Sequence, residues 1–174
     1  MTRSCSLLLR TALLGMLVIA LFAASASRAG KPVIALFISS QRVVRVGAPV
    51  VITVVLTNRS HHSLVIEREV SGTDCQIEVR DDTGKLVPET KFGLVYNGHV
   101  EVVDMSGIDP HDLNRATVNI AVKPKRTLSW GVDVTRFYRM DRPGTYWLSV
   151  QRLDPEDPAL PWVKSNTIEV SIIP

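Results

Sequence analysis

The stretch PGTYWLSVQR at positions 143–152 indicates the fold class of this chain. A Pro-Gly pair is typical of a turn, and the residues after it change side with every step of an extended chain. Tyr146, Leu148 and Val150 share one face of this segment, whereas Trp147 lies on the other face among polar residues. An apolar face opposite a mostly polar one predicts a β-strand that is buried on one side only.

The same two-residue periodicity recurs along most of the chain. The segments that we predict as strands, the first of them broken, are Val33–Ile38 with Arg42–Val46, Val50–Thr57, Ser63–Glu67, Cys75–Arg80, His99–Asp104, Ala116–Val122, Thr145–Arg152 and Thr167–Ile173. In the segment that ends at Val122, we expect Val118, Ile120 and Val122 to lie together on one face. About seven to nine short strands with turn signals every ten or so residues predict an all-β fold, a single antiparallel sandwich.

Helices contribute little to this prediction. Asp133–Arg139 is the one candidate helix, of a turn or two, and Thr90–Gly98 is ambiguous. Ser106–Asn114 and Asp154–Pro161 have the glycine, proline and polar content of loops.

The first 29 residues have the composition of a secretory signal peptide. A short basic segment, Met1–Arg10, precedes the uncharged apolar run Thr11–Ala24, and small residues allow cleavage after Ala26 or after Ala29. The apolar run is 14 residues long, and a membrane-spanning helix needs roughly 20. We therefore expect residues 1–29 to be removed and residues 30–174 to form one secreted or periplasmic domain of the cell envelope, with no membrane span.

The charge balance argues against nucleic acid as a partner. The chain has 20 Lys+Arg and 17 Asp+Glu, and Arg3, Arg10 and Arg28 are the charged residues of the first 29. Removal of the leader leaves 17 groups of each sign. A neutral domain lacks the broad positive field that nucleic-acid binding requires.

Cys75 is the one cysteine that remains after loss of the leader, so the domain has no internal disulfide. It could be a reactive or dimer-forming thiol, or a buried core residue. The second reading is favoured because Ile77 and Val79 follow it on the same face of the strand.

The segment Asp133–Arg152 resembles the corner between strands E and F of immunoglobulin-like sandwiches. A short helical turn is followed by Pro143 and Gly144, and Tyr146 opens the next strand. The resemblance implies that the Tyr146 hydroxyl bonds back to the backbone of the corner. Leu148 stands where antibody-type domains have a disulfide cysteine, so the chain departs from that branch.

The layout is also similar to that of exported bacterial immunoglobulin-like or fibronectin III-like sandwich proteins of unassigned function, and to sandwich segments attached to some secreted proteases. The marks of this resemblance are turn sequences. They are Val46-Gly47-x-Pro49, Thr57-Asn58-x-Ser60, Arg80-Asp81-Asp82-x-Gly84-Lys85, Arg142-Pro143-Gly144-x-Tyr146 and Lys164-Ser165-Asn166. The resemblance implies a fold and no particular reaction, because sandwiches carry unrelated functions.

The sequence contains no catalytic signature. A His-Glu-x-x-His zinc motif, a Gly-x-Ser-x-Gly nucleophile elbow and a glycine-rich phosphate loop are all missing. We expect neither an enzyme nor a cofactor. Asp104, Asp109 and Asp112 are weak candidates for calcium ligands, although Asp109–Asp112 also reads as an ordinary solvated turn.

Tryptophans are the better candidates for binding. An exposed indole at Trp147 or Trp162 could stack on a sugar ring or anchor a protein partner. The alternatives are that another segment covers Trp147 and that Trp162 plugs the surface near a proline-rich turn. Trp130 is expected near a turn, where it would cover a sheet edge.

These features favour a non-catalytic exported module that acts through protein–protein contact at the cell envelope. Two alternatives remain at this point. One is an inhibitor or accessory domain of a secreted protease that uses its polar loops, and the other is a carbohydrate-binding module.

Overall fold

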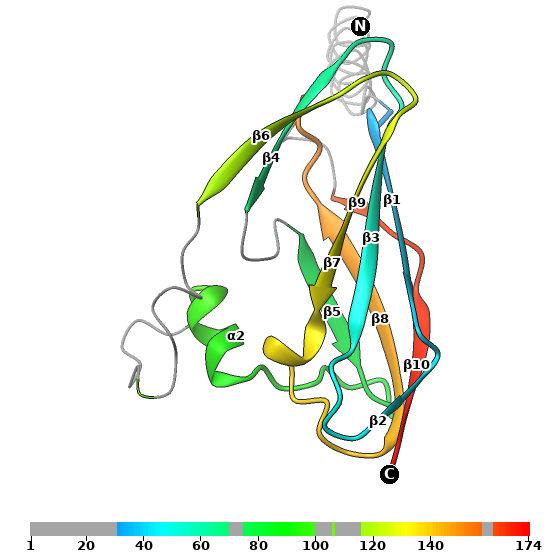
Figure 1. Cartoon of the computed structure of the whole chain (residues 1–174), viewed down its shortest axis with the longest axis vertical. Helices are drawn as coiled ribbons and strands as arrows, with labels where there is room; N and C mark the ends of the chain where they lie inside the picture. Colours follow the sequence, from blue (N-terminus) through cyan, green and yellow to red (C-terminus); the bar gives the residue numbers. More distant parts are fainter. Residues whose placement is uncertain (1–30, 70–74, 100–105, 107–115, 158–161) are drawn as a thin grey trace, which may run out of the picture. The chain divides into compact units, whose positions relative to one another are not determined.

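Two β-sheets face each other across an apolar core in the computed structural model of the chain (Figure 1). The structure describes residues 31–69, 75–99, 106, 116–157 and 162–174. The elements that these residues form are β1 (Ile34–Ser40), β2 (Val43–Arg45), β3 (Val51–Asn58), β4 (Leu64–Glu69), β5 (Gln76–Arg80), helix α2 (Lys91–Tyr96), β6 (Thr117–Val122), β7 (Thr127–Asp133), the 3-10 helix η2 (Val134–Arg136), β8 (Gly144–Arg152), β9 (Val163–Lys164) and β10 (Ile168–Ile173).

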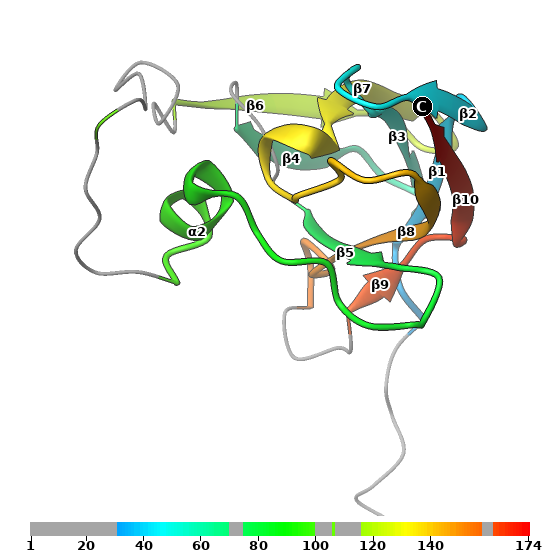
Figure 2. The same cartoon turned by 90° about the horizontal axis from the view of Figure 1, so that it is seen from below.

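The first sheet has the order β1-β3-β7, and the second has the order β2-β10-β8-β5 with β9 on β8. β4 and β6 form a separate pair. Figure 2 shows β3 and β7 in one layer, β5 and β8 in the other, and α2 to one side. All pairings are antiparallel except that of β2 with β10, which is parallel. The predicted all-β sandwich is confirmed, and the described residues contain ten strands, including the short β2 and β9.

Alternating side chains build the core, as the sequence indicates. Leu148 and Val150 of β8 are fully buried, as are Ile52, Val54 and Leu56 of β3 in the opposite sheet. The burial of these large aliphatic side chains is the main favourable term in folding.

Two strands are missing from the sequence prediction, the two-residue β9 and the seven-residue β7. β7 pairs with β3 along its whole length, and Trp130 lies in the middle of it rather than at a turn. The Trp130 side chain is 5% exposed, with the Arg68 guanidinium 5.1 Å from its ring centre. The prediction that Trp130 covers an edge from a turn is therefore wrong, because the alternation of TLSWGVD places it on the inner face of a strand.

The prediction of a short helix in Asp133–Arg139 is met by a single 3-10 turn, but it is not the one helix of the described residues. The range Asp133–Arg139 contains only the three-residue η2, whereas the ambiguous range Thr90–Gly98 contains α2. Thr90 caps α2 by accepting a hydrogen bond from the Gly93 N–H, at 3.0 Å. A capping threonine is a recognised helix start, but a helix of six residues leaves almost no periodic signal.

The common face predicted for Val118, Ile120 and Val122 is buried only at its end. Val122 is 4% exposed, whereas Val118 is 44% exposed. β6 pairs with β4 alone, in a two-stranded sheet. The exposed fraction of these side chains therefore increases along β6 with distance from the junction with β7.

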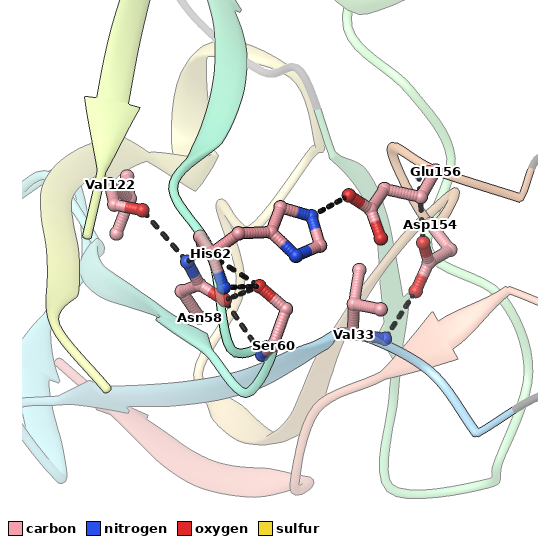
Figure 3. A network of polar contacts seen from close by, with 7 residues as sticks. All are labelled: Val33, Asn58, Ser60, His62, Val122, Asp154 and Glu156. Atoms are coloured by element: carbon pink, nitrogen blue, oxygen red, sulfur yellow. Dashed lines mark hydrogen bonds and ion pairs between the residues drawn. The ribbon is translucent and has the colours of Figure 1, made fainter. Parts of the chain in front are cut away.

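The polar contacts of Asn58 hold the junction between these strand pairs (Figure 3). Its side chain is fully buried. Its amide nitrogen donates to the carbonyl oxygens of Val122 at 2.7 Å and of His62 at 2.8 Å. Its amide oxygen accepts from the Ser60 N–H at 2.8 Å and from the Ser60 hydroxyl at 2.7 Å. The turn sequence Thr57-Asn58-x-Ser60 therefore serves a structural role.

Two further polar side chains fix β1 to later parts of the chain. The Asp154 carboxylate, 1% exposed, accepts from the Val33 N–H at 2.8 Å, as Figure 3 also shows. The Asn166 side chain accepts from the Ile38 N–H at 2.8 Å and donates to the Ile38 carbonyl at 3.0 Å. The Asn166 amide thereby satisfies the backbone N–H and carbonyl of Ile38, in the way that a neighbouring strand would.

Within the described residues, neither helix has the length and apolar content needed to cross a membrane. The predicted signal peptide, both cleavage positions, and most of the predicted strand His99–Asp104 lie outside those residues.

Candidate functional site

A cleft of about 460 Å³ lies beside β5 and α2. Its lining combines carboxylates, amides, a histidine and aromatic rings. The lining residues are Glu69, Cys75, Gln76, Ile77, Glu89, Tyr96, Asn97, His99, Phe137, Tyr138 and Trp162. They come from β4, β5, both sides of α2, the end of η2 and the start of β9, so the fold gathers them from distant parts of the sequence.

Glu89 is the centre of the polar side of this cleft. Its carboxylate contacts His99 Nδ1 at 2.8 Å and accepts a hydrogen bond from the Asn97 side-chain nitrogen. The Glu89 side chain is 11% exposed, whereas that of His99 is 61% exposed. A second carboxylate, that of Glu69, accepts from the Tyr96 hydroxyl. Contacts with Asn97, His99 and Tyr96 therefore hold both carboxylates in place.

Tyr138 is fixed against β5. Its hydroxyl donates to the Ile77 carbonyl at 2.5 Å, and the residue forms an isolated bridge with Glu89. Burial, together with the smaller effect of the nearby charges of Glu89 and Glu78, raises the pKa of Tyr138 from 10 to about 12. The phenol therefore stays neutral and acts as a hydrogen-bond donor.

A three-ring cluster supports the α2 side of the cleft. The Phe137 ring centre lies 5.2 Å from that of Phe92 and 5.3 Å from that of Tyr96, both in edge-to-face arrangements. Gly93 allows this packing, because a Cβ atom there would lie 2.2 Å from the Phe137 carbonyl oxygen. The glycine thus lets the helix backbone approach η2 closely.

The structure separates the two tryptophans that the sequence offers for binding. Trp162 lines the cleft and is 38% exposed. Trp147 is half-buried in the middle of β8, with Glu169 and Arg80 as its cross-strand neighbours. Trp147 is absent from the lining of the cleft.

The residues expected to have structural roles lie in β8 or directly before β8 and β5, and they are Tyr146, Gly144, Pro143 and Cys75. The Tyr146 hydroxyl donates to the Arg142 carbonyl at 3.0 Å, which is the bond that the resemblance to immunoglobulin-like corners implies. Pro143 is exposed in the turn, and Gly144 begins β8 with φ 155°. Cys75 is 6% exposed, although it also lines the cleft.

The calcium candidates Asp104, Asp109 and Asp112 lie outside the described residues. Among the residues that are described, no group of three or more His, Cys, Asp or Glu side chains is arranged to hold a metal ion.

A second surface emerges from the register of β1, β3 and β7. We call it the outer face of the three-stranded sheet. Its residues, which alternate with the buried ones, are Ala35, Phe37, Ser39, Val51, Thr53, Val55, Thr57, Thr127, Ser129, Gly131 and Asp133. Asp133 is the only charged member, and it lies at the end of β7 where it caps η2. The sequence prediction could not assemble this face without β7.

Comparison with known proteins gives no family. No protein-family model matches the chain, and no curated protein matches it. Among solved structures, a CARDB domain from Pyrococcus furiosus, crystallised in complex with di-metal ions, matches with a TM-score of 0.43 and 11% identity over 84% of this chain and 97% of that one. A solution structure of that domain gives a TM-score of 0.36 at 12% identity, covering 82% of this chain and 95% of that one.

A β-glucosidase from Listeria innocua, in complex with isofagomine, matches with a TM-score of 0.39 and 15% identity over 80% of this chain and 16% of the enzyme. These are distant likenesses, and no functional inference follows from them.

Proposed function

We propose that this protein is a non-catalytic module, exported to the cell envelope, that acts through protein–protein contact on the outer face of the three-stranded sheet. The observation that supports this proposal is the lack of charge across that face. A typical surface is roughly 25–35% charged, and the centres of protein interfaces are depleted of charge and enriched in aromatic residues.

Phe37 is the expected anchor of the contact. It is 54% exposed and has Val55 as its cross-strand neighbour on β3. Val51, on the same strand, is 49% exposed. Polar but uncharged residues surround these apolar side chains, and they are cheaper to remove from water than charged ones.

The test places a photo-crosslinking amino acid at Thr53, beside Phe37 on this face, in cells that make the full-length protein. We expect a discrete crosslinked protein that disappears when the change Phe37→Glu is added. The matched control carries the crosslinker at Leu86, which is 61% exposed but lies next to β5 in the other sheet.

A crosslinked product that survives Phe37→Glu, or one that forms equally from Leu86, would contradict the assignment of this face. The Phe37 ring is outside the core, so the Glu variant should keep the wild-type unfolding midpoint within the error of the measurement.

A further inference from the structure

We propose that the cleft beside α2 binds a neutral saccharide, with one sugar ring stacked on Trp162 and its hydroxyls bonded to Glu89, Asn97 and Gln76. This is a second site, distinct from the outer face of the three-stranded sheet. Its lining residues are all different from those of that face.

Trp162 supplies the apolar platform. It is the one tryptophan of the described residues that is counted among the exposed large hydrophobic side chains, at 38%. Removing the exposed part of this indole from water, by packing it against an apolar surface of a ligand, is favourable in free energy. The C–H face of a sugar ring is such a surface.

The polar groups of the cleft match the chemistry of hydroxyls, which donate and accept. A carboxylate has about four lone-pair positions, and the Glu89 oxygens contact Asn97 and His99. Acceptor capacity therefore remains at Glu89. The side-chain oxygen of Gln76 accepts from Gln151 at 2.8 Å, so the Gln76 amide hydrogens are the groups it can offer to a ligand.

The charge of the cleft indicates that the sugar carries no negative charge. Glu69 and Glu89 are acidic, and no lysine or arginine is among the lining residues. A phosphorylated or carboxylated ligand would be repelled by this field. The same two carboxylates would attract a cationic ligand, and the cationic comparator in the experiment below tests that outcome.

The size of the cleft is consistent with this proposal. About 460 Å³ falls in the range of roughly 300–1,000 Å³ for small-molecule sites. Phe137 and the β5 bond of Tyr138 hold one wall rigid, so little conformational entropy is lost when a ligand binds.

The experiment screens the full chain on an array of neutral glycans and then measures affinity by titration calorimetry. Cellotetraose, maltotetraose and chitotetraose are the soluble probes, with triarginine and a sialylated trisaccharide as charged comparators. Trp162→Ala should weaken binding about tenfold or more, whereas Trp162→Phe, which keeps a stacking ring, should change it about threefold or less.

Trp147→Phe is the matched control, because it alters a tryptophan outside the cleft and should leave the affinity unchanged. Absence of binding to every neutral glycan, tighter binding of either charged comparator, or affinity that survives Trp162→Ala would each overturn the proposal. Phe37→Glu should leave glycan affinity intact, so failure of this site and failure of the proposed protein contact give separate results.

Discussion

Replacing Asn58 with alanine removes the side chain that ties the β3–β4 turn to the end of β6. Four hydrogen bonds are lost, to the carbonyls of His62 and Val122 and to the backbone and hydroxyl of Ser60. Alanine offers no polar group in return, and the site is 0% exposed, so water cannot replace these bonds without a rearrangement.

The expected cost follows from those bonds. A typical hydrogen bond contributes about 0.5–1.5 kcal/mol net, and a buried group left unsatisfied costs about 1–3 kcal/mol. Four bonds give a loss of about 4 kcal/mol, which is a large part of the roughly 5–15 kcal/mol that stabilises an ordinary domain. At about 3 °C for each kcal/mol, the unfolding midpoint should fall by about 10–15 °C.

The assay is urea unfolding followed by tryptophan fluorescence, together with a thermal scan. We expect a lower urea midpoint with an unchanged slope, which is the signature of lost stability without a change in the unfolded state. Asn119→Ala is the matched control, since Asn119 is exposed on β6, and it should stay within about 0.5 kcal/mol of the wild type. A loss below about 1 kcal/mol for Asn58→Ala would refute the reasoning, because it would mean that these bonds are replaced by solvent.

Three further predictions concern the corner and the cleft. Gly93→Ala should destabilise the domain by about 1–3 kcal/mol or more, because the new Cβ would lie 2.2 Å from the Phe137 carbonyl oxygen. In the control variant Gly131→Ala, the new Cβ would lie 3.6 Å from its nearest neighbour, so the free energy of unfolding should be nearly unchanged. Urea unfolding of both variants measures the difference. Tyr146→Phe should cost about 1 kcal/mol in the same assay by removing the hydrogen bond to the corner backbone. The pKa of Tyr138 is raised from 10 to about 12 on folding, so the native state keeps a proton that the unfolded chain loses, and stability should fall as pH rises from 10 to about 12, less so in Tyr138→Phe.

Each of these has an outcome that would contradict it. Equal stability of the two alanine variants would show that α2 can move away from η2. A Tyr146→Phe variant as stable as the wild type would show that the corner bond contributes nothing. If spectrophotometric titration placed Tyr138 near pH 10, burial at the β5 wall could not be the controlling effect.

Alternation was enough to predict most of the sandwich. The residues that the pattern of β8 and β10 placed inward, such as Leu148 and Val170, are fully buried, while Ile168 is half-buried. β7 carries the same signal at Leu128, Trp130 and Val132, and it could have been recognised despite the glycine within it. Gly131 weakens this signal, because a glycine inside a strand offers no side chain for packing.

The cleft could not be predicted, for a physical reason. Glu69 and Trp162 are more than 90 positions apart in the sequence, and only the pairing of strands brings them to one wall. The residue type of Trp162 marks it as a candidate for binding, but its polar companions Glu89 and Asn97 belong to no sequence motif. Asn58-Arg59-Ser60 shows the opposite problem: it matches the glycosylation pattern, yet burial and four hydrogen bonds leave the Asn58 amide no room for a glycan.

The attachment of β1 has a consequence for how the protein is made. The groups that bond Val33 and Ile38 belong to residues 121 and 128 positions later, and β2 pairs with the last strand of the chain. During synthesis, Val33 and Ile38 are made before the residues that bond them, so their backbone groups lack those partners until 121 and 128 further residues have been added. Closure of the sandwich therefore joins segments that are far apart in the sequence, and contacts of this kind form slowly in folding.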